Sequence, residues 1–202
     1  VRRTLMDVSV QMLDEIKQRL QRTAPSTSDH LEVIQAALLE SQRFLSTVPS
    51  PATQADLLEA RISLIHALDH LNQLALVVNN GPTAAALDDE KRLQHPRQLL
   101  LELLKTALPW LERKTPAPAL DQLQRLSVDL AEWRRTERRA LLEESAQSTE
   151  ESDQTLTTLD HLRWLDTTGY HIWRALHHLQ NGREKEADDE PISEIRHEAS
   201  DV

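Results

Sequence analysis

Histidine and aspartate residues recur at spacings that could bind a metal ion. His66 and His70 are four residues apart, so both lie on one face of a helix, and Asp69 stands beside His70. Imidazole and carboxylate groups so placed can bind Zn²⁺ or another transition metal. A closed site needs more ligands, and a second Asp-His pair could supply them if two halves of the chain face each other. The candidate metal ligands are His66, Asp69, His70, Asp160 and His161.

The simpler interpretation of these residues is structural. Polar side chains at the edge of a helix-packing seam are commonly hydrogen-bonded or solvated, and the sequence favours this alternative. His171, His177 and His178 extend the segment after His161, but adjacent helical residues point about 100° apart, so we do not expect these three to converge. No cofactor is therefore expected, and a divalent metal is the one candidate ligand.

The sequence lacks the usual signatures of an enzyme. There is no Gly-rich phosphate loop, no Gly-x-Ser-x-Gly turn and no His-Glu-x-x-His helix, and the whole chain has only three glycines and no cysteine. We identify no catalytic residue and no cofactor-binding residue, and we expect a protein that is not an enzyme. The net charge of −10 argues against nucleic acid as a partner, because phosphate binding needs a concentrated basic face.

The composition predicts that helices position these residues. Glycine and aromatic residues are scarce, at 3 and 6 among 202 residues, whereas Leu, Ala, Glu, Gln and Arg are abundant, so the expected fold is all-α. Apolar residues recur in steps of three and four between clusters of Pro, Gly, Ser and Thr. This pattern predicts six helices, at about 4–23, 28–48, 53–78, 96–113, 120–144 and 154–180. Pro109 should kink or restart the fourth helix.

An internal repeat relates the two halves of the chain. Residues 68–74 read LDHLNQL and residues 159–165 read LDHLRWL, and a shift of 91 residues, from Asp69 to Asp160, lays three helices over three helices. The sequence therefore predicts a six-helix bundle of two tandem three-helix repeats, at 1–82 and 83–182. Residues 183–202 are strongly acidic and predict a disordered tail. Gly169, inside the last helix, indicates a close approach of another helix.

Two three-helix units with an acidic motif in each third helix resemble the PhoU family of phosphate-signalling regulators. Residues 68–75 are similar to that family's Asp/Glu-x-x-x-Asp motif, with Gln73 and Trp164 in place of the second carboxylate of each copy. The opening, RTLM at 3–6 and VQML at 10–13, is similar to the PhoU-like domain that follows the membrane part of bacterial sodium/phosphate cotransporters. The resemblance covers about residues 1–182.

The resemblance implies a function and a location. It implies a regulatory or interaction domain in the cytoplasm, tethered to the inner membrane as part of a longer sodium-dependent phosphate transporter and acting in phosphate transport or its regulation. The expected partner is another protein or the transporter's own transmembrane part, and a homodimer is a further option. No membrane span is expected, because the apolar runs are far shorter than about 18 residues.

Two other functions remain open from the sequence. One is a metal-binding helical bundle that uses the Asp-His pairs. The other is a histidine phosphotransfer-type signalling bundle, which also exposes one histidine on a helix but is usually about half this length and has no repeat.

Overall fold

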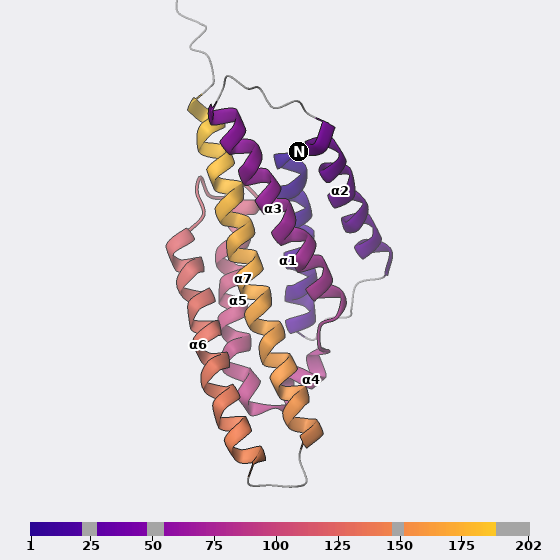
Figure 1. The fold of residues 1–202 in the computed structure, drawn as a ribbon, viewed down its shortest axis with the longest axis vertical. Coiled ribbons are helices and arrows are strands. Elements are labelled where there is room, and N and C mark those ends of the chain that lie inside the picture. Colours follow the sequence, from indigo (N-terminus) through magenta and orange to yellow (C-terminus); the bar gives the residue numbers. More distant parts are fainter. Residues whose placement is uncertain (22–27, 48–54, 147–151, 189–202) are drawn as a thin grey trace, which may run out of the picture.

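The computed structural model describes residues 1–21, 28–47, 55–146 and 152–188, which form seven α-helices and no strand (Figure 1). The predicted all-α fold class is confirmed. In chain order the helices are α1 (Arg2–Leu20), α2 (Ser28–Thr47), α3 (Ala55–Asn79), α4 (Ala84–Asp89), α5 (Lys91–Leu111), α6 (Leu120–Ser145) and α7 (Ser152–Asp188).

The prediction of six helices missed the short helix α4. Thr83 caps it, because the Thr83 hydroxyl accepts a hydrogen bond from the Ala86 amide at 3.3 Å. Three successive alanines after the cap favour a helical turn even without an apolar stripe. The Arg97 side chain of α5 then binds both Asp88 of α4 and the carbonyl oxygen of Leu20, so α4 is tied to α5 and to the end of α1.

Helix α5 does not restart at Pro109, and backbone hydrogen bonds form its end. It begins at Lys91, five residues before the predicted start, and continues past Pro109 to Leu111. The Arg113 amide then donates to the Trp110 carbonyl, and the Lys114 amide donates to the Pro109 carbonyl. Arg113 has φ 62°, the left-handed conformation that this pair of hydrogen bonds requires at a helix end.

Helix α7 is longer than predicted. It passes through Asn181 and Gly182, the expected stop, and ends at Asp188. The predicted tail is thus helical over residues 183–188, and its remainder, 189–202, lies outside the described residues. A single glycine costs a helix only about 1 kcal/mol, and the Arg, Glu, Lys and Ala residues that follow it favour continuation.

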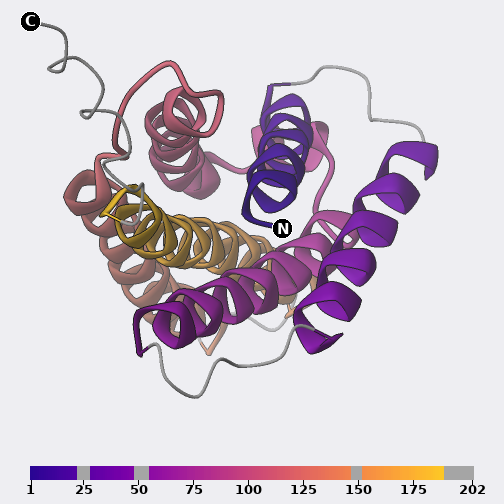
Figure 2. The same ribbon diagram turned by 90° about the horizontal axis from the view of Figure 1, so that it is seen from above.

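The helices pack in a pattern that is the same for the two halves of the chain. The most extensive pairing joins α3 to α7, and α1 pairs with α5. Around this centre α1, α2 and α3 contact one another, and so do α5, α6 and α7. Figure 2 shows α2 outside α3 and α6 outside α7, with α1 and α5 on the opposite side. Exchanging α1–α3 with α5–α7 therefore reproduces these pairings, although the smaller contact of α1 with α7 has no counterpart of the same extent between α3 and α5.

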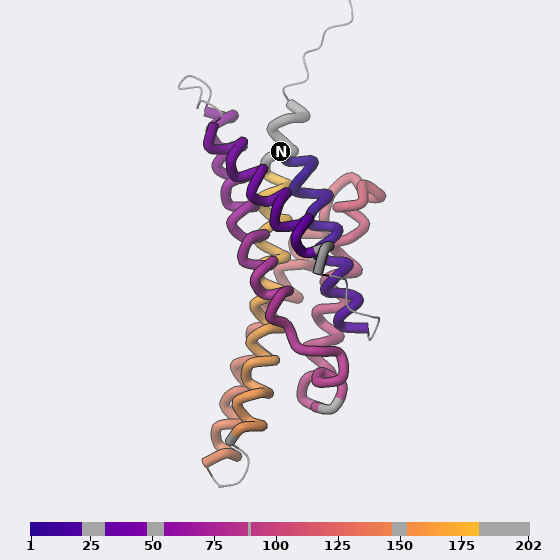
Figure 3. The backbone as a smooth tube through the Cα atoms, turned by 90° about the vertical axis from the view of Figure 1, so that its right-hand side faces the viewer, coloured from indigo at the N-terminus to yellow at the C-terminus, as the bar shows by residue number. Residues whose placement is uncertain are grey.

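One apolar core is shared by both halves. Fully buried residues from the first half, such as Leu71 and Leu74, belong to the same cluster as Leu165, Ile172 and Leu176 from the second. The long helices α6 and α7 extend past the others at one end of the bundle, whereas α1 begins and α7 ends toward the opposite end (Figures 1 and 3). No helix of the described segments is long and apolar enough to cross a membrane.

The close helix approach predicted at Gly169 is confirmed. A Cβ atom at this position would lie 2.5 Å from the Cδ1 atom of Leu130 on α6 and 3.6 Å from Cδ1 of Leu103 on α5. Glycine thus brings the middle of α7 against both neighbouring helices of its half.

Candidate functional site

The antiparallel packing of α3 on α7 decides which polar side chains meet. Along the pair, Trp164 donates from Nε1 to the Val77 carbonyl at 2.8 Å, and His171 lies against His70. Further along α7, His178 lies against His66. Rising numbers on α7 therefore meet falling numbers on α3. The apolar stripe of each helix is buried in this seam, so the histidines lie at its edge.

Four histidines alternate between the two helices, and we call them the histidine ladder: His66 and His70 on α3, and His171 and His178 on α7. The Nδ1 atoms of His70 and His171 are 3.1 Å apart. The ring of His178 stacks near His66, with centroids 4.9 Å apart, and near His70, with centroids 5.8 Å apart. At the His70–His171 contact one Nδ1 atom must carry a proton and the other must accept it.

The ladder favours neutral imidazoles. Burial, followed by the neighbouring His171 and Arg174, lowers the pKa of His70 from 6.5 to about 4, although Asp69 opposes this. Burial and then Arg174 lower the pKa of His178 to about 4 as well. Burial also lowers the pKa of His171. These three rings are therefore uncharged at neutral pH, and each has one unprotonated nitrogen.

The structure gathers only part of the predicted metal site. His66 and His70 lie in the ladder, and the exposed Asp69 lies beside them. Asp160 and His161 lie elsewhere, because His161 precedes His171 by ten residues, or about 15 Å of helix. The two Asp-His pairs do not converge, since the antiparallel register sets His171, not His161, opposite His70. Throughout the described ranges, no group of three or more His, Asp or Glu side chains is arranged to hold a metal ion.

Sequence reasoning missed the two histidines of α7 that complete the ladder. His177 lies outside the ladder, with its ring 5.2 Å from that of the adjacent His178 and 6.3 Å from that of Trp173. However, His171 and His178 are seven residues apart, nearly two helical turns, so they point to the same side. That spacing could have shown from the sequence that His171 and His178 share a face of α7. Which residues of α3 lie opposite them depends on the register between the two helices.

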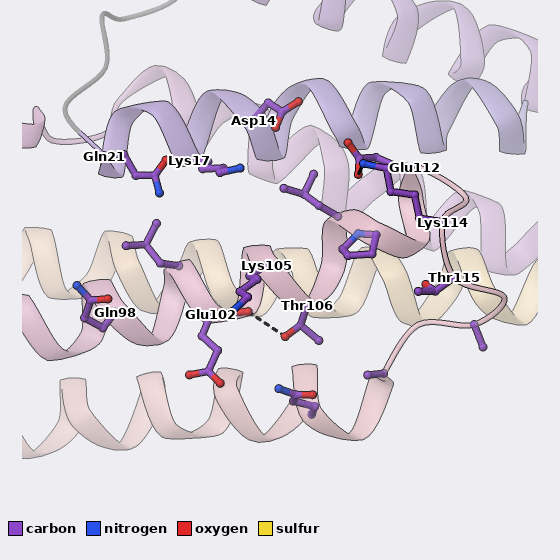
Figure 4. A pocket seen from close by; sticks show the side chains of 16 residues that line it. Asp14, Lys17, Gln21, Gln98, Glu102, Lys105, Thr106, Glu112, Lys114 and Thr115 are labelled. Atoms are coloured by element: carbon purple, nitrogen blue, oxygen red, sulfur yellow. Dashed lines mark hydrogen bonds and ion pairs between the residues drawn. The ribbon is translucent and has the colours of Figure 1, made fainter.

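A second candidate is a groove between α1, α5 and the start of α6, with a volume of about 1120 Å³. Figure 4 shows Asp14 and Lys17 of α1 on one wall and Glu102 and Lys105 of α5 on the other. Three acidic and three basic side chains line it, including Lys114, which pairs with Glu112 at 2.7 Å. Because the charges balance, the groove favours neither anions nor cations.

A third candidate is an apolar surface on the α2–α3 hairpin. Of the twelve large apolar side chains that are exposed in the described segments, eight lie on α2 and α3. Leu58, Ile62 and Ile65 follow each other in steps of four and three on α3, and we call them the α3 stripe. Their exposed fractions are 43, 43 and 44%. Phe44 on α2 is 55% exposed.

In comparisons with known proteins, no protein-family model, no curated protein and no solved structure matches the chain.

Proposed function

We propose that this chain is a non-enzymatic regulatory and interaction domain of the PhoU type, forming the cytosolic part of a sodium-dependent phosphate transporter and acting in phosphate transport or its regulation. The assignment to phosphate transport rests on the resemblance of residues 1–182 to such domains. The role in binding another protein rests on the surface of the α2–α3 hairpin.

The helix arrangement supports the two-repeat architecture of this proposal. The chain runs through α1, α2 and α3 and then, after the short α4, through α5, α6 and α7, with equivalent neighbours in both halves. Such an arrangement is what a duplicated three-helix unit predicts when its two copies pack around a pseudo-twofold axis.

The observation that carries the interaction role is the uneven distribution of exposed apolar side chains. Contiguous apolar surface on a folded domain commonly marks a contact with another protein. Here the α3 stripe places three large side chains on one face of the helix, next to a hairpin partner that also exposes Phe44. Burial of this surface in a partner would be favourable by about 25 cal/mol for each Å² removed from water.

The test is sodium-dependent phosphate uptake in cells from which the gene for this protein has been deleted. The cells are complemented with the wild-type gene or with the double variant Ile62→Glu/Ile65→Glu. We expect wild type to restore the original uptake of radiolabelled phosphate and the variant to fail, because charge on the α3 stripe opposes its burial. The matched control is Val128→Glu on α6, where Val128 is 46% exposed, and it should behave as wild type.

Two outcomes would contradict the proposal. If deletion leaves sodium-dependent phosphate uptake unchanged, the role in phosphate transport is wrong. If the stripe variant and the Val128→Glu control both restore uptake, the α3 stripe is not the contact surface. Equal melting temperatures for the purified variants and wild type are required, so that a loss of uptake is not a loss of folding.

A further inference from the structure

The contact between His70 and His171 has the geometry of two ligands on one metal ion. Their Nδ1 atoms are 3.1 Å apart and come from two helices, α3 and α7. Two imidazoles bound to one tetrahedral Zn²⁺ ion, with bonds of about 2.0–2.1 Å, hold their nitrogens about 3.3 Å apart. An ion could thus take the place of the shared proton, which would move to the Nε2 atom of the same ring, with a small outward movement of the rings.

The protonation state of the pair suits a metal ion. Only a neutral imidazole has a lone pair to donate, and burial lowers the pKa of both His70 and His171. Arg174 lies near enough to lower the pKa of His70, so its charge also opposes a bound cation. Asp69 acts in the other direction, because it raises the pKa of both histidines and attracts positive charge.

The ion can also reach the pair. Both rings are only partly buried at the edge of the seam, so solvent contacts them. The ring of His178 is nearly parallel to that of His70, at 11°, and therefore packs on its face instead of aiming a nitrogen at the same point. Because no third His, Asp or Glu side chain in the described segments completes the set, water would fill the remaining positions.

We propose that His70 and His171 form a two-histidine site for a transition-metal ion such as Zn²⁺, bound by both Nδ1 atoms and completed by water. Imidazole ligands select zinc, nickel and copper over magnesium and calcium. The bound ion would join α3 to α7 and so connect the two halves of the molecule. This site uses neither Asp160 nor His161, and it does not depend on the role in phosphate transport.

The test uses the full 202-residue chain, stripped of metal with a chelator that is then removed. Calorimetric titration with Zn²⁺ should show one bound ion per chain, and titration with Mg²⁺ should show none. We expect His70→Ala and His171→Ala each to weaken Zn²⁺ binding at least about tenfold, because one of two protein ligands is lost. His161→Ala and His177→Ala are matched controls on α7 and should bind as wild type does.

A second measurement uses the wild-type protein, so its result does not depend on whether the variants fold. In histidine ring ¹⁵N spectra, Zn²⁺ should shift the Nδ1 resonances of His70 and His171 and leave those of His161 in place. The melting temperature should rise with Zn²⁺, since an ion that binds only the folded state stabilises it. Absence of Zn²⁺ binding, binding that persists in the His70→Ala/His171→Ala double variant, or equal shifts of all histidine rings would overturn the proposal.

Discussion

Protonation of His70, His171 and His178 is costly because each of these rings is partly withdrawn from water. His70 contacts His171 and His178, and Arg174 adds a fixed positive charge to the same seam. His177 and His66 contribute further to the lowered pKa of His178. A proton added to any one ring therefore raises the cost of the next.

This cost predicts an acid-sensitive seam. The unfolded chain takes up protons on His70 and His178 near pH 6.5, whereas the folded chain takes them up only near pH 4. The unfolded state thus binds more protons in this window, so stability is complete above pH 6.5 and is lost as the pH falls toward 4. Since both rings are partly exposed, we expect a loss on the order of 1–2 kcal/mol for the two together.

The measurement is the free energy of unfolding in urea between pH 7.5 and 4, with a chelator present so that no metal contributes. The double variant His70→Gln/His178→Gln should lose less stability on acidification than wild type does. His95→Gln, on α5 and outside the ladder, should keep the wild-type profile. Parallel profiles for wild type and the double variant would show that the ladder does not titrate as described.

The residues of the ladder were only half predictable. His66 and His70 could be paired from their spacing alone, because one helix fixes it. Their true neighbours, His171 and His178, follow from the register of α3 against α7, which is set by buried residues such as Leu71 and not by any polar pattern. Register between two helices is a tertiary property, so local spacing could not choose His171 over His161.

Among the helices, two ends that lie beside a proline were predicted closely. The end of α3 at Asn79, ahead of Gly81-Pro82, lies one residue from its prediction, and the start of α6 at Leu120 agrees with it. The helix ends predicted wrongly were those inferred from a single glycine or proline. Gly182 does not stop α7, and Pro109 does not divide α5, because the neighbouring turns and the packing of each helix outweigh a single unfavourable residue.

Because α7 packs closely on α6, the stability of a variant at Gly169 should depend on the size of the new side chain. Gly169→Leu should destabilise the bundle by about 1–3 kcal/mol, because a larger side chain overlaps Leu130. Gly169→Ala should change stability by less than about 1 kcal/mol, since its gain in helix propensity offsets the displacement of one flexible Leu130 methyl group. Thermal and urea unfolding of the two variants give the comparison.

Two further variants make that comparison specific. Ala36→Leu, at an exposed position of α2, adds the same bulk without overlap and should be nearly neutral. The double variant Gly169→Leu/Leu130→Ala should recover part of the lost stability, because it opens space at the contact. If Gly169→Leu melts at the wild-type temperature, α7 does not approach α6 as closely as described.

At the scale of the whole molecule, α1–α3 and α5–α7 share one apolar core. The largest helix pairing, α3 with α7, and the pairing of α1 with α5 both join one unit to the other. Each unit alone would expose the apolar stripes that these pairings bury. We therefore expect each half of the chain to depend on packing against the other for its stability.

This arrangement predicts that neither unit folds alone. Residues 1–82 and 83–202, made separately, should each show little cooperative unfolding, and mixing them should restore helical circular dichroism and a single melting transition. The intact chain under the same conditions is the control. A cooperative transition in either isolated fragment, at a temperature near that of the intact chain, would establish two independent domains.

The beginning of α1 and the end of α7 lie toward the same end of the bundle, and this has a mechanical consequence (Figure 1). A force applied between them pulls α1 and α7 away from the bundle from one end, so their contacts break in succession and not all at once. The chain lacks cysteine, so handles can be attached at two introduced cysteines. We expect optical tweezers to unfold the protein at lower force through positions 1 and 188 than through positions 1 and 153, which lie at opposite ends and load the contacts in shear. Equal unfolding forces for the two attachments would contradict this geometry.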